Sequence, residues 1–468
     1  MGGITDLRFV VHDPVKFPDT QEEISGPSPY WNTPTRGPSY IKPENRQKPL
    51  KSKGKLDSLY SKYSTDMSPL LGTTYSVEAR ITDILKDDDL LHDLALLVSQ
   101  RGVVIFKKQE DLTVDQQKDL VQKLGILSGK PKNNGLHIHP TTRAGGVITQ
   151  NGTIDPEVSF ISTRISKKIN IFDSLPTGFS WHSDITFEPV GSDYSSFRLV
   201  ELPPLGGDTF FANGYALYEK LSPPLREFFE GLTGTYSQPK FNDFGRNECF
   251  KLYTNERGAP ENVGEELIAV HPIVRTNPVT GWKSLFAVGG HFTKFNELSP
   301  LESKTMKEYI WNTLVQAHEI QVRHRWDKHD VAIWDNRSSY HAINRDIYHY
   351  KNVIRSGIRT VGIAERPYLD PNSITQTEGL SLIEKEIEEV AKKQNEAKVE
   401  ADRKKSEKEK EESSNSETSI NSTSQIDEKK LDDGCQRCKR QKVTNTGCYL
   451  EVSSLKEKER RGTVLDGE

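Results

Sequence analysis

Apolar residues occur only in short pieces up to about residue 75, and beyond it their spacing predicts secondary structure. Leu94, Leu96, Leu97 and Val98 predict one helix. Residues 102–106 (Gly-Val-Val-Ile-Phe) follow as an apolar run with the length of a buried strand. A folded domain is therefore expected to begin near this point of the chain.

Two helix starts are marked by polar residues with the spacing of a capping box. Thr113 and Gln116 form the first, and apolar residues follow at helical intervals as far as Gly125, where the helix is expected to stop. Ser299 and Glu302 form the second, with a proline in the first turn. These signals predict a few helices with well-defined beginnings.

Between these helices, apolar and polar residues mostly alternate, which is typical of half-buried strands. Residues 320–326 alternate, residues 327–330 suit a turn, and Val331 and Ile333 alternate again, so a hairpin is predicted here. Many short strands with a few surface helices favour a mainly β fold, a sandwich or jelly roll, over a parallel sheet.

The two ends of the chain differ in composition from its middle. Residues 1–75 are rich in proline, glycine, serine and lysine, which predicts an extended N-terminal arm. Residues 376–468 begin with a short predicted helix and continue mainly with lysine, glutamate, serine and asparagine, so a charged, largely disordered tail is expected. The folded domain is therefore placed at residues 76–375.

Charge and hydropathy exclude several classes of protein. Lys+Arg number 63 and Asp+Glu 67, a formal net charge of -4, so neither nucleic acid nor an anionic membrane surface is expected as the main partner. No apolar run reaches the about 18 residues of a membrane span. The N-terminus lacks the apolar core of a signal peptide, so a cytoplasmic protein is expected.

The four cysteines are not distributed like a disulfide framework. Cys249 is isolated, whereas Cys435, Cys438 and Cys448 lie in the charged tail. The spacing of Cys435 and Cys438 resembles the opening of a zinc cluster, but a closed zinc site needs four ligands and the tail has no histidine to supply the fourth. A structural zinc site is therefore not predicted, and the role of these cysteines stays open.

The segment Trp181-His182-Ser183-Asp184 carries the most informative polar residues. In a strand, His182 and Asp184 would point to one face, because side chains alternate. An imidazole and a carboxylate on one face supply two ligands of the facial triad that binds iron(II) in non-heme oxygenases. His341, which follows a predicted strand, can supply the third. The alternative for the pair taken alone is a surface histidine beside an aspartate.

Two arginines farther along suit the recognition of an anion. Arg355 and Arg359 are separated by an even number of residues, so in a strand both guanidiniums lie on one face. A guanidinium binds a carboxylate or sulfonate through paired donors. The alternative is a pair of surface arginines in salt bridges. Thr209, in a Gly-Gly-Asp-Thr turn, can offer a hydroxyl to the same ligand or simply belong to the turn.

These segments together resemble the taurine dioxygenase (TauD/TfdA) family, and in detail its fungal sulfonate dioxygenase branch. The resemblance runs in order from about residue 80 to residue 372. The matching segments are 181–187, 201–204 (Glu-Leu-Pro-Pro), 206–209, 269–272 (Ala-Val-His-Pro), 275–278, 332–337 (Ala-Ile-Trp-Asp-Asn-Arg) and 355–360.

The resemblance implies a double-stranded β-helix (jelly roll) core with flanking α-helices. It implies iron(II) bound by His182, Asp184 and His341, with 2-oxoglutarate and O2 as co-substrates. Carried over by position, the residues near 2-oxoglutarate are Thr209, Arg355 and Trp334. Those near the substrate are His139, Arg359, Ile185 and Phe286.

The chain departs from the taurine enzymes at Thr142, where they carry tyrosine, and at Gly178, where they carry asparagine. Both family residues serve the amino end of taurine, so another small anionic substrate is expected. The predicted reaction hydroxylates the carbon next to a sulfonate and releases sulfite and an aldehyde, with succinate and CO2 as co-products, for sulfur acquisition. The alternatives are a sulfate ester, an aryloxy acid or a purine as substrate, or an inactive core that serves as an interaction protein; a homo-oligomer stays open.

Overall fold

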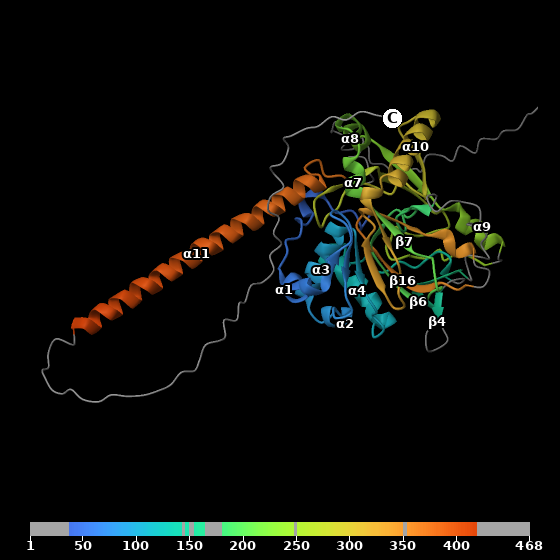
Figure 1. Cartoon of the computed structure of the whole chain (residues 1–468). Coiled ribbons are helices and arrows are strands. Elements are labelled where there is room, and N and C mark those ends of the chain that lie inside the picture. Colours follow the sequence, from blue (N-terminus) through green and yellow to red (C-terminus); the bar gives the residue numbers. More distant parts are fainter. Residues whose placement is uncertain are drawn as a thin grey trace, which may run out of the picture. The chain divides into compact units, whose positions relative to one another are not determined.

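The computed structural model describes residues 37–142, 146–148, 154–163, 180–247, 250–349 and 353–418 (Figure 1). One compact unit ends at Val390 and a second begins at Ala391. Every helix in the described part is too short or too polar to cross a lipid bilayer.

The largest sheet in the described part has eight strands in the order β1-β2-β3-β14-β6-β16-β5-β4. Neighbouring strands are antiparallel except for β2 and β3, which are parallel. Side chains on both faces of the central strands are buried, so both faces of the sheet are covered. The strands are β1 (Ser64–Asp66), β2 (Thr73–Tyr75), β3 (Val103–Phe106), β14 (Val331–Asp335), β6 (Ser192–Glu201), β16 (Ser356–Ile363), β5 (Ile154–Ser162) and β4 (Gly146–Ile148).

Helices cover one face of this sheet (Figure 1). Their apolar side chains form one buried cluster with Val104, Tyr194 and Ile333 of the sheet. The helices are α1 (Lys55–Tyr60), α2 (Ile81–Ile84), α3 (Asp88–Arg101) and α4 (Val114–Leu127).

Both predicted capping boxes are confirmed, at Thr113 for α4 and at Ser299 for α10 (Pro300–Gln316). The predicted stop at Gly125 is wrong, because α4 continues to Leu127. A Cβ atom on Gly125 would lie 2.5 Å from Oδ2 of Asp193. The glycine therefore allows the helix to pack closely on the sheet and does not end it.

A three-stranded sheet in the order β13-β7-β15 covers the other face. The ring of Phe211 in β7 lies 5.8 Å from that of Trp334 in β14, and the ring of Phe197 in β6 lies 5.3 Å from that of Trp326. The fold is therefore rich in layered sheets, as predicted. The strands of this smaller sheet are β13 (Gln321–His324), β7 (Thr209–Asn213) and β15 (Ser339–Ile343).

The predicted hairpin over residues 320–333 is wrong. Strand β13 pairs with β7, whereas β14 pairs with β3 and β6 of the large sheet. The turn itself is present, and the buried carboxylate of Asp330 accepts hydrogen bonds from Nζ of Lys107 and the backbone N–H groups of Lys108 and Asp327. These bonds direct the chain from one sheet to the other, so the two alternating segments do not pair.

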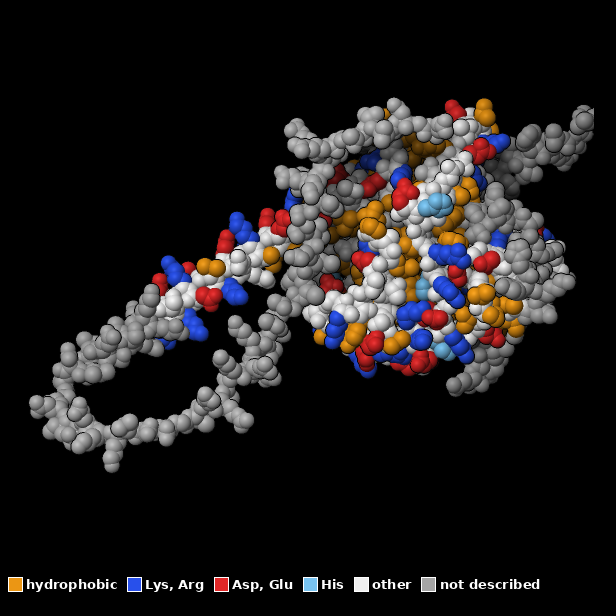
Figure 2. Space-filling view, in the orientation of Figure 1, with side chains coloured by type: hydrophobic (Ala, Val, Ile, Leu, Met, Phe, Trp, Pro, Cys, Tyr) orange, Lys and Arg blue, Asp and Glu red, His pale blue; other side chains and the backbone are white. Residues whose placement is uncertain are grey.

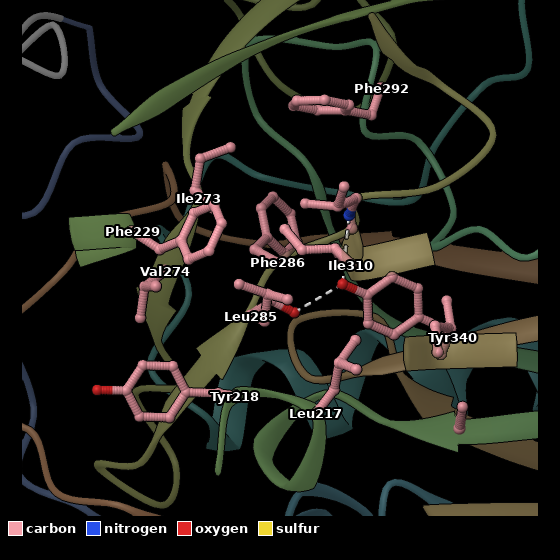
Figure 3. Packing of buried hydrophobic residues seen from close by; sticks show 14 of the residues in the cluster. Leu217, Tyr218, Phe229, Ile273, Val274, Leu285, Phe286, Phe292, Ile310 and Tyr340 are labelled. Atoms are coloured by element: carbon pink, nitrogen blue, oxygen red, sulfur yellow. Dashed lines mark hydrogen bonds between the residues drawn. The ribbon is translucent and has the colours of Figure 1, made fainter. Parts of the chain in front are cut away.

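A second apolar cluster lies around the remaining small strands and helices (Figure 3). The Tyr340 hydroxyl donates to the carbonyl of Leu285 at 2.9 Å and accepts from the N–H of Val288 at 3.2 Å. These bonds join β15 to the segment that precedes Gly289. The elements not yet given are β8 (Thr233–Ser237), β9 (Ile268–Pro272), β10 (Val274–Thr276), β11 (Lys283–Leu285), β12 (Phe292–Phe295), α7 (Gly214–Glu219), α8 (Pro223–Glu230), α9 (Pro239–Asn247), η2 (Pro43–Asn45), η3 (Ser61–Tyr63), η5 (His318–Ile320) and η6 (Arg345–His349).

The structure describes part of the expected N-terminal arm and part of the expected C-terminal tail. Strand β2 belongs to the main sheet, where Tyr75 stacks on Phe106 at 4.9 Å, and the domain boundary near residue 75 stays a prediction. The C-terminal helix α11 (Gln376–Thr418) has 43 residues and is longer than the short helix expected. Ion pairs one turn apart, such as Arg403–Glu400, stabilise it, and basic and acidic side chains are interspersed along it (Figure 2). Outside the described residues lie Gly178, Cys249, Cys435, Cys438 and Cys448.

Replacing Gly357 of β16 with alanine is expected to destabilise the fold. A Cβ atom there would lie 2.1 Å from Cζ of Phe197. The ring would have to move within a filled core, which costs about 1–3 kcal/mol of unfolding free energy. Gly135→Ala is the matched control, because no heavy atom lies within 4 Å of its Cβ position. Urea denaturation of both variants measures the difference, and equal unfolding free energies would contradict this packing.

Candidate metal centre

The side chains of His182, Asp184 and His341 converge on one point. Each offers a ligand atom, and these atoms all lie within 4.8 Å of one another. Nε2 of His182 lies 3.9 Å, and Nε2 of His341 lies 3.8 Å, from Oδ1 of Asp184. The convergence expected from the sequence is therefore present.

A short backbone bridge brings the two histidines together. The N–H of His182 donates to the carbonyl of His341 at 3.1 Å, and the N–H of His341 donates back at 2.8 Å. His341 lies in β15, whereas His182 lies in an isolated bridge rather than in a strand. The chain then turns at Ile185, whose φ of 61° is in the left-handed region. This turn follows Asp184 directly and ends the extended segment that carries both ligands.

The surroundings keep both imidazoles neutral. Nδ1 of His182 lies 2.7 Å from the carbonyl of Ser180, and because a carbonyl only accepts, Nδ1 carries the proton and Nε2 keeps its lone pair. Burial lowers the pKa of His182, with the charge of Asp184 opposing the shift. Burial and the neighbouring His182 lower the pKa of His341 to about 3. Two neutral nitrogens are thus available to a metal at neutral pH.

The carboxylate of Asp184 is held in its ionised form. Burial raises its pKa, but the neighbouring guanidinium of Arg359 lowers that pKa below its ordinary value. Nη1 of Arg359 donates to Oδ1 at 2.6 Å, and Oγ of Ser195 donates to Oδ2 at 2.8 Å. The charge that a metal ligand needs is therefore present before any metal binds.

Asn336 holds this carboxylate in place. Its side-chain oxygen accepts from the backbone N–H of Asp184 at 3.1 Å and from Nε1 of Trp334 at 2.9 Å. Its amide nitrogen donates to Oγ of Ser195 at 2.9 Å. One side chain thus fixes both the backbone of the aspartate and the hydroxyl that bonds to it, as the residues around metal ligands commonly do.

The donor set fits iron(II). Two neutral histidine nitrogens and one carboxylate form the facial triad of non-heme iron sites, which leaves coordination positions open. The side chain of His182 is 30% exposed, whereas that of Asp184 is 3% exposed, so the site opens on the His182 side. The three residues can therefore hold one metal ion and leave room for other ligands.

A second group of residues suits a carboxylate ligand. Oγ1 of Thr209 accepts from Nε1 of Trp326 at 3.0 Å and from Nη2 of Arg355 at 3.3 Å. The hydroxyl proton of Thr209 can therefore be donated to a bound group. The guanidinium of Arg355 lies 5.2 Å from the Phe197 ring centroid, and it also donates to the carbonyl of Gly207 at 2.8 Å.

Arg355 and Arg359 both face Phe197, as expected from their even separation. Arg359 is directly opposite Phe197 in the pairing of β16 with β6, and cross-strand partners point to the same face. Gly357, which lies between the two arginines, leaves the space that the ring fills. Arg359 in β16 and Arg355, which directly precedes β16, therefore both lie on the side of Phe197.

The other predicted site residues lie in different surroundings. The ring of Trp334 lies 4.9 Å from that of His341, and the ring of His139 lies 4.8 Å from that of Phe241. Ile185 is buried in the cluster that contains Phe187 and Val190. Phe286 is 2% exposed within the cluster of Figure 3, where it contacts His271 and Tyr236. The roles given to these residues stay predictions.

Sequence reasoning missed four residues of this region. Ser195 lies in a strand that is buried on both faces, where alternation gives no sign of function. Asn336 and Trp326 lie within or beside segments already considered, and only their contacts reveal them. His291 lies outside the segments considered in the sequence, and its ring lies 5.7 Å from that of His182.

The chain is similar to known dioxygenases. The model of the taurine catabolism dioxygenase TauD, TfdA family matches residues 64–352. Alpha-ketoglutarate-dependent dioxygenase esdpJ of Penicillium shearii is 38% identical over 378 residues, covering 73% of this chain and 98% of that protein. The alpha-ketoglutarate-dependent sulfonate dioxygenase of Saccharomyces cerevisiae is 29% identical, covering 79% and 82%. A crystal structure of a taurine dioxygenase from Burkholderia xenovorans shares 26% identity with a TM-score of 0.51, covering 67% and 92%.

Replacing Ser195 with alanine is expected to weaken iron(II) binding by roughly 10- to 100-fold, because Asp184 loses a hydrogen bond that orients it. Anaerobic calorimetric titration with iron(II) measures this affinity. Ser196→Ala is the matched control, since its buried Oγ has no hydrogen-bond partner among the described residues. An unchanged affinity in Ser195→Ala would show that the hydroxyl does not support the ligand.

Proposed function

The chain belongs to the taurine catabolism dioxygenase TauD, TfdA family and is an alpha-ketoglutarate-dependent dioxygenase, and we propose that its substrate is a small organosulfonate. The observation that carries this proposal is the position of Arg359. Its guanidinium lies 2.6 Å from the carboxylate of Asp184, one of the three candidate metal ligands. A cation at this position suits a substrate whose anionic head lies next to the reacting carbon.

Iron(II) would be held by His182, Asp184 and His341, and when bound it supplies the activation of O2 and 2-oxoglutarate. The far carboxylate of 2-oxoglutarate would pair with Arg355 and accept the proton of Thr209. Trp334, packed against His341, would exclude water from this side of the centre. The chain's own residues thus position the reactants and keep them in a buried environment.

The charges of the site favour a monoanionic substrate. The divalent metal and the two arginines carry four positive charges, whereas Asp184 and dianionic 2-oxoglutarate carry three negative ones. The imidazoles of His139 and His291 are neutral, because burial lowers the pKa of both, that of His291 to about 3. One positive charge remains, and a sulfonate neutralises it. A charge-balanced, buried complex avoids the cost of an unpaired ion.

The reaction consumes one O2 and one 2-oxoglutarate for each substrate molecule. One oxygen atom enters succinate as CO2 leaves, and the other becomes a hydroxyl on the carbon that carries the sulfonate. The carbon–sulfur bond then breaks, its electron pair leaves with sulfite, and the hydroxyl becomes an aldehyde carbonyl. The residues next to this carbon would be Ile185 and Phe286, with His139 and Arg359 at the sulfonate.

An organosulfonate without an amino group is favoured over taurine. Thr142 stands where taurine enzymes carry tyrosine, and its buried hydroxyl has no hydrogen-bond partner among the described residues. A sulfate ester is the second candidate, since a Pseudomonas putida relative named as a sulfate ester dioxygenase is 33% identical over 170 residues. We also propose that the core is a double-stranded β-helix, that the catalytic domain spans residues 76–375 and that the protein is cytoplasmic.

The purified protein, loaded anaerobically with iron(II) and 2-oxoglutarate and then exposed to O2, is expected to release sulfite from simple alkanesulfonates. Release should be weaker with taurine, because Thr142 cannot replace the tyrosine. Sulfite and succinate are measured together across alkanesulfonates, taurine and alkyl sulfates. Succinate in step with sulfate from alkyl sulfates, without sulfite from any sulfonate, would overturn the organosulfonate assignment and favour the sulfate ester.

A further inference from the structure

Aromatic and imidazole rings contact one another in a chain that reaches the candidate metal centre. The ring of His139 lies 4.8 Å from that of Phe241, which lies 5.6 Å from that of Phe187. Phe187 lies 5.2 Å from His291, and His291 lies 5.7 Å from His182. A histidine therefore stands at each end of a pair of phenylalanines, and one of these histidines contacts a metal-ligand residue.

Thr186 contacts one ring nitrogen of His291. Its Oγ1 lies 2.9 Å from Nδ1 of His291, and this is the one acceptor for the Thr186 hydroxyl among the described residues. With this hydroxyl as the donor to Nδ1, the imidazole carries its proton on Nε2. No described residue bonds to this Nε2. His291 thus presents an unused N–H donor to the space beside His182.

His139 also contacts a threonine through Nδ1. The backbone N–H of Thr141 donates to Nδ1 of His139 at 3.2 Å, and Oγ1 of Thr141 lies 2.8 Å from the same atom. Because a backbone N–H can only donate, His139 also carries its proton on Nε2. The two histidines are therefore equivalent donors, each with a threonine on Nδ1, at the two ends of the pair of phenylalanines.

The backbone of His291 is placed by two glycines. The N–H of Gly290 donates to the carbonyl of Trp181 at 2.8 Å, and a Cβ atom on Gly289 would lie 2.5 Å from that carbonyl oxygen. The N–H of Ser237 donates to the carbonyl of His291 at 2.9 Å. The loop is thus held against the segment that carries His182, at a distance that a larger residue at position 289 would not allow.

We propose that His291 is a substrate-binding residue that donates its Nε2–H to an oxygen of the anionic head group, across the site from His139. This inference rests on the proposed function. His291 is not part of the cluster of candidate ligands, so its N–H is left for a group bound at the open side of the metal. Together with Arg359, the two neutral donors would bind three oxygens of one sulfonate without adding charge.

The test uses His291→Phe, which keeps a flat ring and removes the donor, and His291→Gln, which keeps an N–H. His318→Phe is the matched control, because His318 is exposed and distant in sequence from the site. An alkanesulfonate is titrated into protein loaded with manganese(II), which is redox-inert here, and 2-oxoglutarate. His291→Phe is expected to weaken sulfonate binding by about tenfold or more, the effect of losing a hydrogen bond to a charged group. His291→Gln should recover part of that loss.

Manganese(II) and 2-oxoglutarate affinities should change less than twofold in His291→Phe, and sulfite released per succinate should fall. Unchanged sulfonate affinity, or a loss of metal affinity of the same size, would overturn the inference and make His291 a packing partner of His182. If wild-type protein binds the sulfonate but releases no sulfite, the proposed function fails while this inference still stands on the binding data. If wild-type protein binds no sulfonate, both fail.

Discussion

Two backbone hydrogen bonds between His182 and His341 are the constraint on which the site depends. They join strand β15 of the small sheet to a segment that enters the sandwich from elsewhere in the chain, and they set the two imidazoles side by side. Asp184 reaches the same point because the chain turns directly after it, at Ile185. The layered sheets thus act as a frame that brings three distant side chains around one small volume.

A few buried contacts set the charges of the three candidate metal ligands. Asp184 stays ionised because Arg359 and Ser195 bond to its two oxygens, while burial keeps the histidines neutral. A metal cation would therefore meet a carboxylate and two lone pairs without first displacing protons. The guanidinium of Arg359, which donates to this carboxylate, is also suited to an anionic substrate.

Much of this could be predicted from the sequence, because the chemistry lies in short motifs. The ligands, the arginine pair and the sheet-rich fold follow from residue types, spacing and family resemblance. The partner of each strand cannot be predicted in this way. Alternation over residues 320–333 indicates two strands, but it does not show that the bonds of Asp330 direct these strands into different sheets. Gly125 was misread because a glycine that allows close packing resembles one that ends a helix. The contacts of Ser195 with Asn336 and of His291 with Thr186 join residues that are far apart in the sequence, so a single sequence does not reveal them.

The most direct test is a crystal structure of the anaerobic, iron(II)-loaded protein, with the metal located by anomalous scattering at the iron edge. A single peak bonded to His182, Asp184 and His341, at about 2.0–2.2 Å from each, is the predicted result. A peak elsewhere, or one that leaves the imidazole of His341 unbound, would contradict the account.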